Sequence, residues 1–311
     1  MQIDVVLPWV DGNDEKHRSK MLPYVKDKSK FQSEMFRTRF DHVNEIKFAV
    51  DSILKFAPFV TNIYLITDKQ TPDFLTKENN AEFYNKVSII DHTLIFSGYE
   101  EYLPTFNNRP IDTCLHRIPN LAEHFLYFND DVFLINKTQP EDFFKNEWPI
   151  IRGEWTKFEE DKIKKLVKKP KVGHKTAQQI AAKQLGFKKY YRFRHTPHPL
   201  RKSTFVNYFK ENEDIFIENI KHKFRHPNQF TPQGLANHIE IKNGTCYFEN
   251  DLKLKYFRSY KKPLFWYKFK LNVIGKGKLF LGLQSLDHCP PIILTYLLKW
   301  LDKKTNTKIN Y

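Results

Sequence analysis

The feature that most constrains the fold is the stretch from Phe125 to Ile135, where two acidic residues separate two apolar runs. Phe125–Phe128 and Val132–Ile135 flank Asp130 and Asp131. A short apolar run bounded by polar residues predicts a buried strand. Two carboxylates at its end would be costly to keep ionised without a partner. A divalent cation shared with a diphosphate would be such a partner, and a β-hairpin with its turn at 129–131 is the alternative.

The composition is that of a globular protein with excess positive charge. With 311 residues and 41% hydrophobic side chains, the chain can bury a full core, and we expect a single catalytic domain over 1–311. Lys and Arg total 51 against 36 acidic residues, which gives a formal net charge of +15. This charge favours nucleic acid, anionic lipid or phosphorylated substrates as partners, but an AT-rich genome also produces Lys-rich sequences.

Cysteine usage and hydropathy indicate a cytoplasmic protein. Cys114, Cys246 and Cys289 are far apart and form no C-x-x-C motif, which argues against a disulfide framework and a zinc site. No basic stretch followed by an apolar core marks a signal peptide at the N-terminus. The longest apolar segment, 290–298, is far shorter than the roughly 20 residues that a membrane span requires.

The first part of the chain predicts an α/β fold. Residues 3–9 form a β-branched strand, apolar residues recur at helical spacing over 46–57, and 62–67 form a second strand. This order predicts a parallel pair with a right-handed crossover. Asp11 and Gly12 follow the first strand, at the sheet edge where open α/β sheets bind ligands, although an ordinary turn is the alternative.

A third strand is predicted at 87–90, and the loop 103–110 leads into a helix that continues to Ile118. The start of this helix, preceded by Asn107 and Arg109, could hold a phosphate. His116 and Arg117 lie further along it, although a lone histidine on such a helix is more often structural.

The segment 152–190 is rich in lysine, and we interpret it as a basic helical insertion or lid. It contains a Lys-rich run at 162–171 and a predicted helix at 176–187. Such a run is usually a solvated face, but it could also attract an anionic acceptor.

Two basic clusters follow the insertion. His195 and His198 lie in a Pro-rich segment that restrains the backbone, and histidine suits general-base work near neutral pH. Arg225 lies in a second basic cluster and could contact a phosphoryl group in a bidentate manner. Either cluster could equally be a generic basic surface.

The last third predicts aromatic strand-like pieces at 245–249 and 262–269. An apolar run at 279–284 then leads to Asp287, and a helix is expected at 290–301.

Four motifs in this order resemble those of the Stealth proteins, hexose-1-phosphate transferases of bacterial capsules that are related to the GlcNAc-1-phosphotransferase of lysosomal enzymes. Together the motifs span about residues 3–287. The fourth departs from the family, which usually shows Asn-Asp where this chain has Leu286-Asp287. The motifs are 3–12, the segments between 39 and 134, 195–198 with 224–226, and 284–287.

The resemblance implies a nucleotide-sugar-binding, Rossmann-like (glycosyltransferase-A-like) mixed sheet flanked by helices, with Mg²⁺ or Mn²⁺ as cofactor. In such a family member, an acceptor hydroxyl attacks the phosphorus next to the sugar of a donor such as UDP-GlcNAc. A phosphodiester forms on a growing capsule glycan, and a nucleoside monophosphate leaves. The implied partners are the donor and the glycan, not nucleic acid, and the positive charge is compatible with peripheral attachment to the inner membrane.

The resemblance also implies roles for individual residues. His195, with His198 as the alternative, would accept the hydroxyl proton, and Arg225 would stabilise charge on the phosphoryl group. The implied metal ligands are Asp130, Asp131 and Asp287, and the implied donor-binding residues are Asp11, Gly12, Asn107, His116 and Arg117.

Two other classes of function remain open. A conventional metal-dependent glycosyltransferase would release a nucleoside diphosphate instead. A polyanion-binding protein without activity has only the net charge in its favour, because the sequence contains no known nucleic-acid-binding motif.

Overall fold

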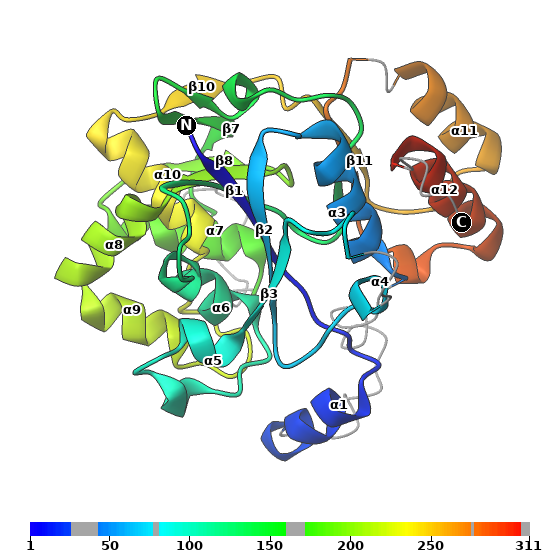
Figure 1. Ribbon diagram of the computed structural model, residues 1–311. Coiled ribbons are helices and arrows are strands. Elements are labelled where there is room, and N and C mark those ends of the chain that lie inside the picture. Colours follow the sequence, from blue (N-terminus) through cyan, green and yellow to red (C-terminus); the bar gives the residue numbers. More distant parts are fainter. Residues whose placement is uncertain (26–42, 77–80, 160–171, 275–276, 306–311) are drawn as a thin grey trace.

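The computed structural model describes residues 1–25, 43–76, 81–159, 172–274 and 277–305. Its centre is a five-stranded sheet with strand order β3-β2-β1-β4-β9 (Figure 1). Strands β1 to β4 are parallel, and β9 runs antiparallel to β4. These strands are β1 (Ile3–Pro8), β2 (Val60–Thr67), β3 (Val87–Asp91), β4 (His124–Tyr127) and β9 (His198–Arg201).

Two smaller sheets flank the central one. The first has strand order β10-β7-β6, with β8 paired to β7, and the second has strand order β11-β12-β5. Their strands are β5 (Val132–Leu134), β6 (Phe144–Lys145), β7 (Trp148–Thr156), β8 (Tyr190–Phe193), β10 (Tyr247–Glu249), β11 (Leu254–Phe257) and β12 (Phe280–Leu283).

Helices cover both faces of the central sheet (Figure 1). One face packs against α3 (Glu45–Phe56), and the same apolar core continues to α11 (Leu264–Phe269) and α12 (Pro291–Thr305). The other packs against α5 (His92–Ile95), α6 (Asn108–Cys114), α8 (Lys202–Glu211), α9 (Glu213–Ile220) and α10 (Pro232–Asn243). The remaining helices are α1 (Glu15–Met21), α4 (Asp73–Thr76) and α7 (His174–Gln184), and the short 3-10 and π segments are Leu22–Tyr24, Glu100–Tyr102, Leu115–Arg117, Pro140–Asp142, Lys270–Ile274 and Leu286–His288.

Strand β1 is apolar on both sides because each side meets a core. Val5 and Leu7 pack on the α3 side, and Val6 packs on the α6 side. The buried Asp4 is satisfied at the strand ends: its carboxylate accepts hydrogen bonds from the Asn62 backbone at 3.1 Å and the Ala122 backbone at 2.8 Å. Asp4 therefore connects β1 to the segments beside it instead of facing an apolar core alone.

The α/β fold with a mixed sheet flanked by helices is confirmed, and so is the buried strand that precedes Asp130 and Asp131. The hairpin alternative is wrong, because β4 pairs with β1 and β9 whereas β5 pairs with β12. The strand-like interpretation of 262–269 is also wrong: Pro263 precedes a helix, α11, whose aromatic residues gave a misleading strand signal.

The predicted insertion at 152–190 begins inside strand β7 and contains the expected helix as α7. Its lysine run, 162–171, lies outside the described residues. None of the helices in the described parts of the chain combines the length and the apolar character that crossing a bilayer requires.

Candidate active site

A cavity of about 630 Å³ lies beside the carboxyl end of β4, where the chain leaves the central sheet. The sheet extends from β1 in both directions, to β2 and to β4, and open α/β sheets bind ligands at such a switch point. The volume falls within the range of small-molecule sites. The charged and titratable side chains of the lining include Arg109, Asp112, Asp131, His174, Lys175, Arg192, Arg194, His195, His198, Arg225 and Arg258.

His195 and Asp131 form a hydrogen-bonded pair in the cavity wall. Nε2 of His195 lies 2.6 Å from Oδ1 of Asp131, and Nδ1 lies 3.3 Å from the side-chain nitrogen of Asn129. Because a carboxylate accepts and an amide NH₂ donates, the neutral imidazole carries its proton on Nε2 and a lone pair on Nδ1. Burial lowers the pKa of His195, but the charges of Asp131 and Asp130 outweigh burial and raise it above the ordinary value of 6.5.

Tyr256, from the sheet that contains β5, supports the ring of His195. The two ring centroids are 5.5 Å apart, and the Tyr256 hydroxyl donates to Oε1 of Gln284 at 2.7 Å. A Cβ atom on Gly282 would lie 2.5 Å from a ring carbon of Tyr256, so glycine is required for β12 to approach this ring. Tyr256 belongs to β11, which pairs with β12, and β12 pairs with β5; this order of strands places Tyr256 beside the histidine.

A chain of polar contacts continues from His195 into the protein. The hydroxyl of Tyr127 lies 3.1 Å from Oδ1 of Asn129 and 3.2 Å from Oδ2 of Asp112. Gln233 donates its side-chain amide to the same Asp112 oxygen at 3.0 Å. Burial raises the pKa of Asp112 to about 7, against the opposing effects of Gln233, Tyr127 and two arginines. Burial therefore favours the neutral form of Asp112 more than the neutral form of an exposed aspartate.

Tyr127 has a single hydroxyl proton, so the protonation of Asp112 decides whether Tyr127 donates to Asp112 or to Asn129. A neutral Asp112 donates to the Tyr127 oxygen, which leaves Tyr127 able to donate to Oδ1 of Asn129. Asn129 then keeps its amide nitrogen directed at His195. When Asp112 is ionised, Tyr127 donates to the carboxylate instead and Asn129 loses its donor. The neutral acid is thus the form that holds Asn129 in its observed orientation.

His198 has a different environment, although only three residues separate it from His195. It is the first residue of β9, it is buried, and its ring packs edge-on against Phe193 at a centroid distance of 4.6 Å. Burial, helped by the charges of His174 and His195, lowers the pKa of His198 to about 3. A histidine with such a low pKa is a weak base, so the two environments favour His195 as the proton acceptor.

Arginines line much of the remaining cavity wall. Arg109 is fixed by three backbone carbonyls: Nη1 donates to His226 at 3.0 Å and to Gln229 at 3.4 Å, and Nη2 donates to Gly173 at 3.1 Å. Arg194 forms an ion pair with Glu154 at the exposed rim. Planar guanidinium groups recognise phosphate oxygens well, so the cavity suits a phosphate-bearing ligand. The arginines that line the cavity are Arg109, Arg192, Arg194, Arg225 and Arg258.

Asp131 lines the cavity and Asp130 precedes it in the chain; the two carboxylates could supply two ligands to a magnesium ion that takes its other ligands from a diphosphate and water. In the described parts of the chain, no three His, Cys, Asp or Glu residues are grouped to hold a metal. Oδ2 of Asp287, the predicted third ligand, lies 3.2 Å from Nε2 of His288. Burial and the charges of Asp130 and Asp131 raise the pKa of Glu45 to about 8, so a nearby cation would offset an excess of carboxylates.

Three of the predicted donor-binding residues lie close to the sheet edge but outside the cavity lining. Asp11 and Gly12 follow β1, as expected, and the backbone amide of Asp11 donates to Gln70 at 2.9 Å. Asn107 is buried, and its side chain accepts from the backbone of Arg109 at 3.2 Å and donates to Gln229 at 2.7 Å. Asn107 therefore supports a cavity arginine from behind.

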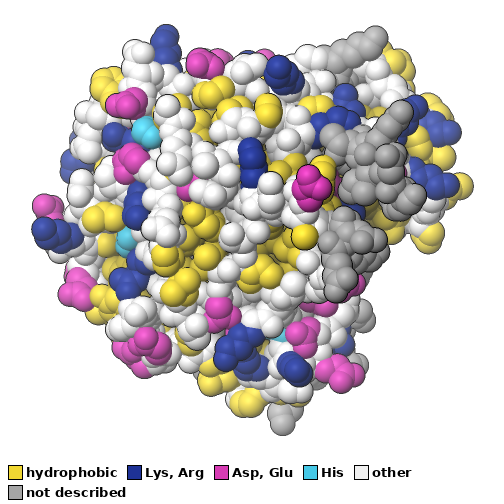
Figure 2. Space-filling view, in the orientation of Figure 1, with side chains coloured by type: hydrophobic (Ala, Val, Ile, Leu, Met, Phe, Trp, Pro, Cys, Tyr) yellow, Lys and Arg dark blue, Asp and Glu magenta, His cyan; other side chains and the backbone are white. Residues whose placement is uncertain are grey.

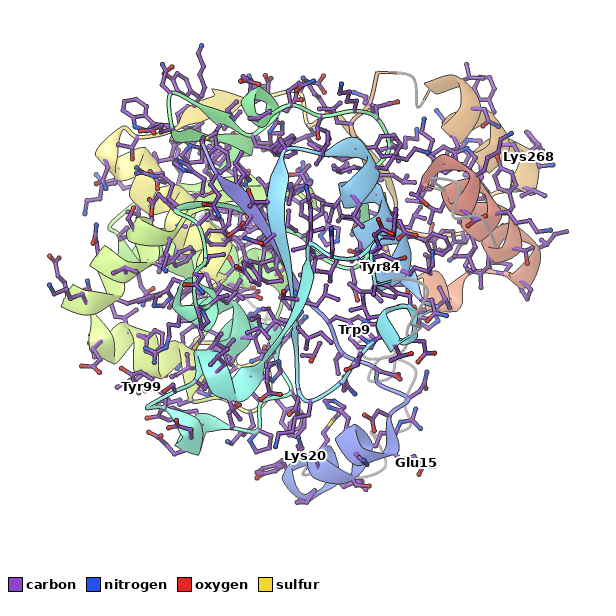
Figure 3. The ribbon with its side chains drawn as sticks, viewed as in Figure 1. Trp9, Glu15, Lys20, Tyr84, Tyr99 and Lys268 are labelled. Carbon is purple, nitrogen blue, oxygen red and sulfur yellow. The ribbon has the colours of Figure 1, made fainter. Side chains whose placement is uncertain are left out.

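The structure does not bring His116 and Arg117 to the cavity. The His116 ring stacks on Phe205, with centroids 6.1 Å apart, inside the aromatic core. Arg117 donates to the carbonyl of Ile95 at 2.8 Å and packs over the ring of Tyr99, which Figure 3 labels. Only the first part of α6 faces the cavity, and these two residues lie beyond its end.

Several cavity residues were not assigned individual roles, although local patterns could have indicated them. Arg109 and Asp112 are three residues apart, which places them on one side of a helix. Leu254, Tyr256 and Arg258 alternate along and just beyond β11, and all three line the cavity. The polar chain that ends at Asp112, in contrast, depends on contacts between distant elements.

Comparisons with known proteins identify the family. The models described as Stealth protein CR1, conserved region 1, and Stealth protein CR2, conserved region 2, match residues 1–29 and 39–150. Among solved structures, the galactosyltransferase LgtC matches 99% of this chain and 97% of its own, with a TM-score of 0.48 and 10% identity.

Curated relatives carry the name capsular polysaccharide phosphotransferase. The cps1A protein of Actinobacillus pleuropneumoniae is 42% identical over 46% of this chain, and the matched part spans only 38% of that relative. LcbA of Neisseria meningitidis is 36% identical over 72% of this chain and 60% of its own length. The relative from Neisseria meningitidis serogroup B is 30% identical over 85% of this chain and 72% of its own length. The chain belongs to the Stealth family.

Proposed function

We propose that this chain transfers a sugar-1-phosphate from a nucleotide sugar such as UDP-GlcNAc to a hydroxyl group of a growing glycan, in capsule or surface polysaccharide synthesis. The observation that carries the proposal is the hydrogen-bonded pair of His195 and Asp131 in a cavity lined by five arginines. The names of the relatives support this class of reaction.

In the proposed reaction, the oxygen of the acceptor hydroxyl forms a bond to the phosphorus next to the sugar. The bond between that phosphorus and the oxygen that bridges the two phosphates breaks, and the nucleoside monophosphate leaves with that oxygen. The hydroxyl proton moves to Nδ1 of His195, which exchanges its contact with Asn129 for the acceptor. Asp131 holds the ring through Nε2 and stabilises the imidazolium.

Phosphoryl transfer depends mainly on positioning and on neutralising charge. Arg225 is our candidate for the side chain that stabilises charge on the transferred group, because it lines the same cavity as His195. Asp130 and Asp131 would hold a magnesium or manganese ion, which when bound neutralises charge on the diphosphate.

The alternative is conventional glycosyl transfer, which breaks the bond between sugar and phosphate. To separate the two, purified protein is incubated with a panel of nucleotide sugars, magnesium and capsule-type oligosaccharides, and the released nucleotide is identified by chromatography. Release of a nucleoside monophosphate together with a phosphodiester product is expected. Release of a nucleoside diphosphate would replace the proposal with glycosyl transfer, and no turnover of any donor would contradict both.

A further inference from the structure

The helix α11 and the π-helical turn that follows it expose an apolar stripe to solvent. Phe265 is 71% exposed, and Phe269 and Val273 are each 53% exposed. Their spacing of four residues places them on one side of the helix. The opposite side also carries apolar residues, Tyr267 and Leu271, which are buried in the core. A helix that is apolar on both sides is usually covered on both sides, whereas here one side faces solvent.

The neighbouring helix α12 extends this stripe. Its Ile292 is 69% exposed and lies one helical turn before Tyr296. Asn272 donates from its side chain to the Tyr296 hydroxyl at 3.3 Å and accepts from the indole nitrogen of Trp300 at 3.1 Å, so the two helices are in direct contact. Figure 1 shows α11 and α12 side by side at one end of the molecule. The exposed residues Phe265, Phe269, Val273 and Ile292 form what we call the apolar stripe.

Most of the apolar stripe belongs to a lysine-rich segment of the chain. Between Leu252 and Leu286 the sequence contains nine Lys or Arg residues and no Asp or Glu. Lys261, Lys262 and Lys268 are exposed, and within the described residues none of them forms an ion pair with a carboxylate. Lys268 lies at the outer edge of the molecule in Figure 3, and Figure 2 shows hydrophobic and basic side chains together along this edge.

We propose that the apolar stripe and its lysines bind the surface of an anionic phospholipid membrane, with α11 lying in the plane of the interface. Aromatic and aliphatic side chains flanked by lysines are the composition of helices that lie in this way. Phe side chains would enter the boundary between headgroups and acyl chains, while Lys side chains would extend to lipid phosphates. Charge complementarity selects a membrane over a second copy of this chain, because two copies would bring the same lysines together.

The apolar stripe begins a few residues after a segment that lines the cavity. Tyr256 and Arg258 line the cavity, and Lys261 follows three residues after Arg258. A membrane bound at α11 would therefore lie a short length of chain from the cavity wall. The inference rests on the exposed side chains and their charge and does not depend on the proposed function.

Sedimentation with lipid vesicles tests the proposal directly. The full chain is mixed with vesicles of phosphatidylglycerol and phosphatidylethanolamine, and in parallel with vesicles of phosphatidylcholine alone. We expect binding to the anionic vesicles that weakens with added salt, and at least about tenfold weaker binding to the neutral ones, because each lysine near an anionic surface contributes roughly a fivefold gain in affinity.

Two variants separate the apolar and the charged contributions. Phe265→Ser with Phe269→Ser should weaken binding to anionic vesicles by at least about tenfold, because two aromatic rings no longer leave water. The matched control is Phe248→Ser, which removes a 52% exposed Phe from strand β10; it should bind like the wild type. All variants are checked for an unchanged circular dichroism spectrum.

The second set of variants removes positive charge. Lys261→Gln with Lys262→Gln and Lys268→Gln should weaken binding at least tenfold, whereas the exposed control set Lys188→Gln, Lys210→Gln and Lys242→Gln should have a much smaller effect. Equal losses in both sets would mean that only overall charge matters and would overturn the assignment to α11. Unchanged binding in the Phe variant would also overturn it, as would a wild-type dimer that this variant converts to monomer without loss of vesicle binding.

Discussion

The loop that carries His195 and the strand that carries His198 differ in chemistry, although they are neighbours in the sequence. His195 lies in the loop before β9 and contacts Asp131, whose charge raises the pKa of the imidazole. His198 is inside β9 between aromatic rings, and burial lowers its pKa to about 3. The comparison shows that contact with the Asp131 carboxylate, not membership of a motif, determines which of the two imidazoles has the higher pKa.

Removing the Asp131 carboxylate, the partner of His195, should have the largest effect on the difference between the two histidines. Asp131→Asn deprives His195 of its negative partner and removes a candidate metal ligand, so kcat should fall by about 10⁴-fold, as when a carboxylate that orients a catalytic histidine is lost. Removing the charge should also lower the pKa of His195, so the acid limb of any residual activity should move to lower pH. The exposed Asp251→Asn serves as the control. Wild-type kcat in Asp131→Asn would contradict the pairing.

A smaller effect is expected at the far end of the polar chain. Asp112→Ala removes the group that directs Tyr127 toward Asn129, so kcat should fall by about 10- to 100-fold, as for outer partners of other sites. Asp112→Asn should retain more activity than Asp112→Ala, because its amide can donate to Tyr127 as the neutral acid does, although that nitrogen can no longer accept from Gln233. Measurement of kcat and KM for both variants checks this. Equal losses in the two variants would mean that Asp112 acts only through packing or as a charge.

Replacing His198 in strand β9 should have a still smaller effect on activity. His198→Phe keeps an aromatic ring between Tyr127 and Phe193, and we expect kcat to fall by less than tenfold. A general base would cost about 10²–10⁴-fold. A loss of that size in steady-state assays, with His195→Phe milder, would assign the base to His198 and reverse the comparison.

Replacing His116 in the aromatic core should change the stability of the protein and not its activity. Burial lowers the pKa of His116 to about 4, so below pH 6.5 the unfolded chain binds this proton more readily than the folded one. Stability is therefore lost as the pH falls from 6.5 towards 4, by about 2 kcal/mol at pH 5 from this residue alone. Urea unfolding of His116→Phe at pH 7.5 and pH 5 should show a pH-dependent loss smaller by that amount. An unchanged loss would contradict the buried neutral histidine.

Local patterns in the sequence predicted the parts of the molecule that depend on local order. The β-branched run that begins at Ile3, the helical spacing after Glu45 and the acids after Phe128 each appear where expected. His116 was misplaced because a motif does not show which face of its helix meets the core. The hydrogen-bond chain from Asp112 joins α6, β4 and α10, and no local pattern reports contacts across such distances.

The central claim is that His195 accepts the proton in a phosphoryl transfer, and one assay tests it most directly. Release of nucleoside monophosphate from the preferred nucleotide sugar is measured for the wild type, His195→Ala and His198→Ala, with donor binding measured by calorimetry. The wild type should release monophosphate, and His195→Ala should lose about 10²–10⁴-fold in kcat with unchanged donor affinity, while His198→Ala loses much less. Wild-type release of diphosphate, or a kcat for His195→Ala within threefold of wild type, would contradict the claim.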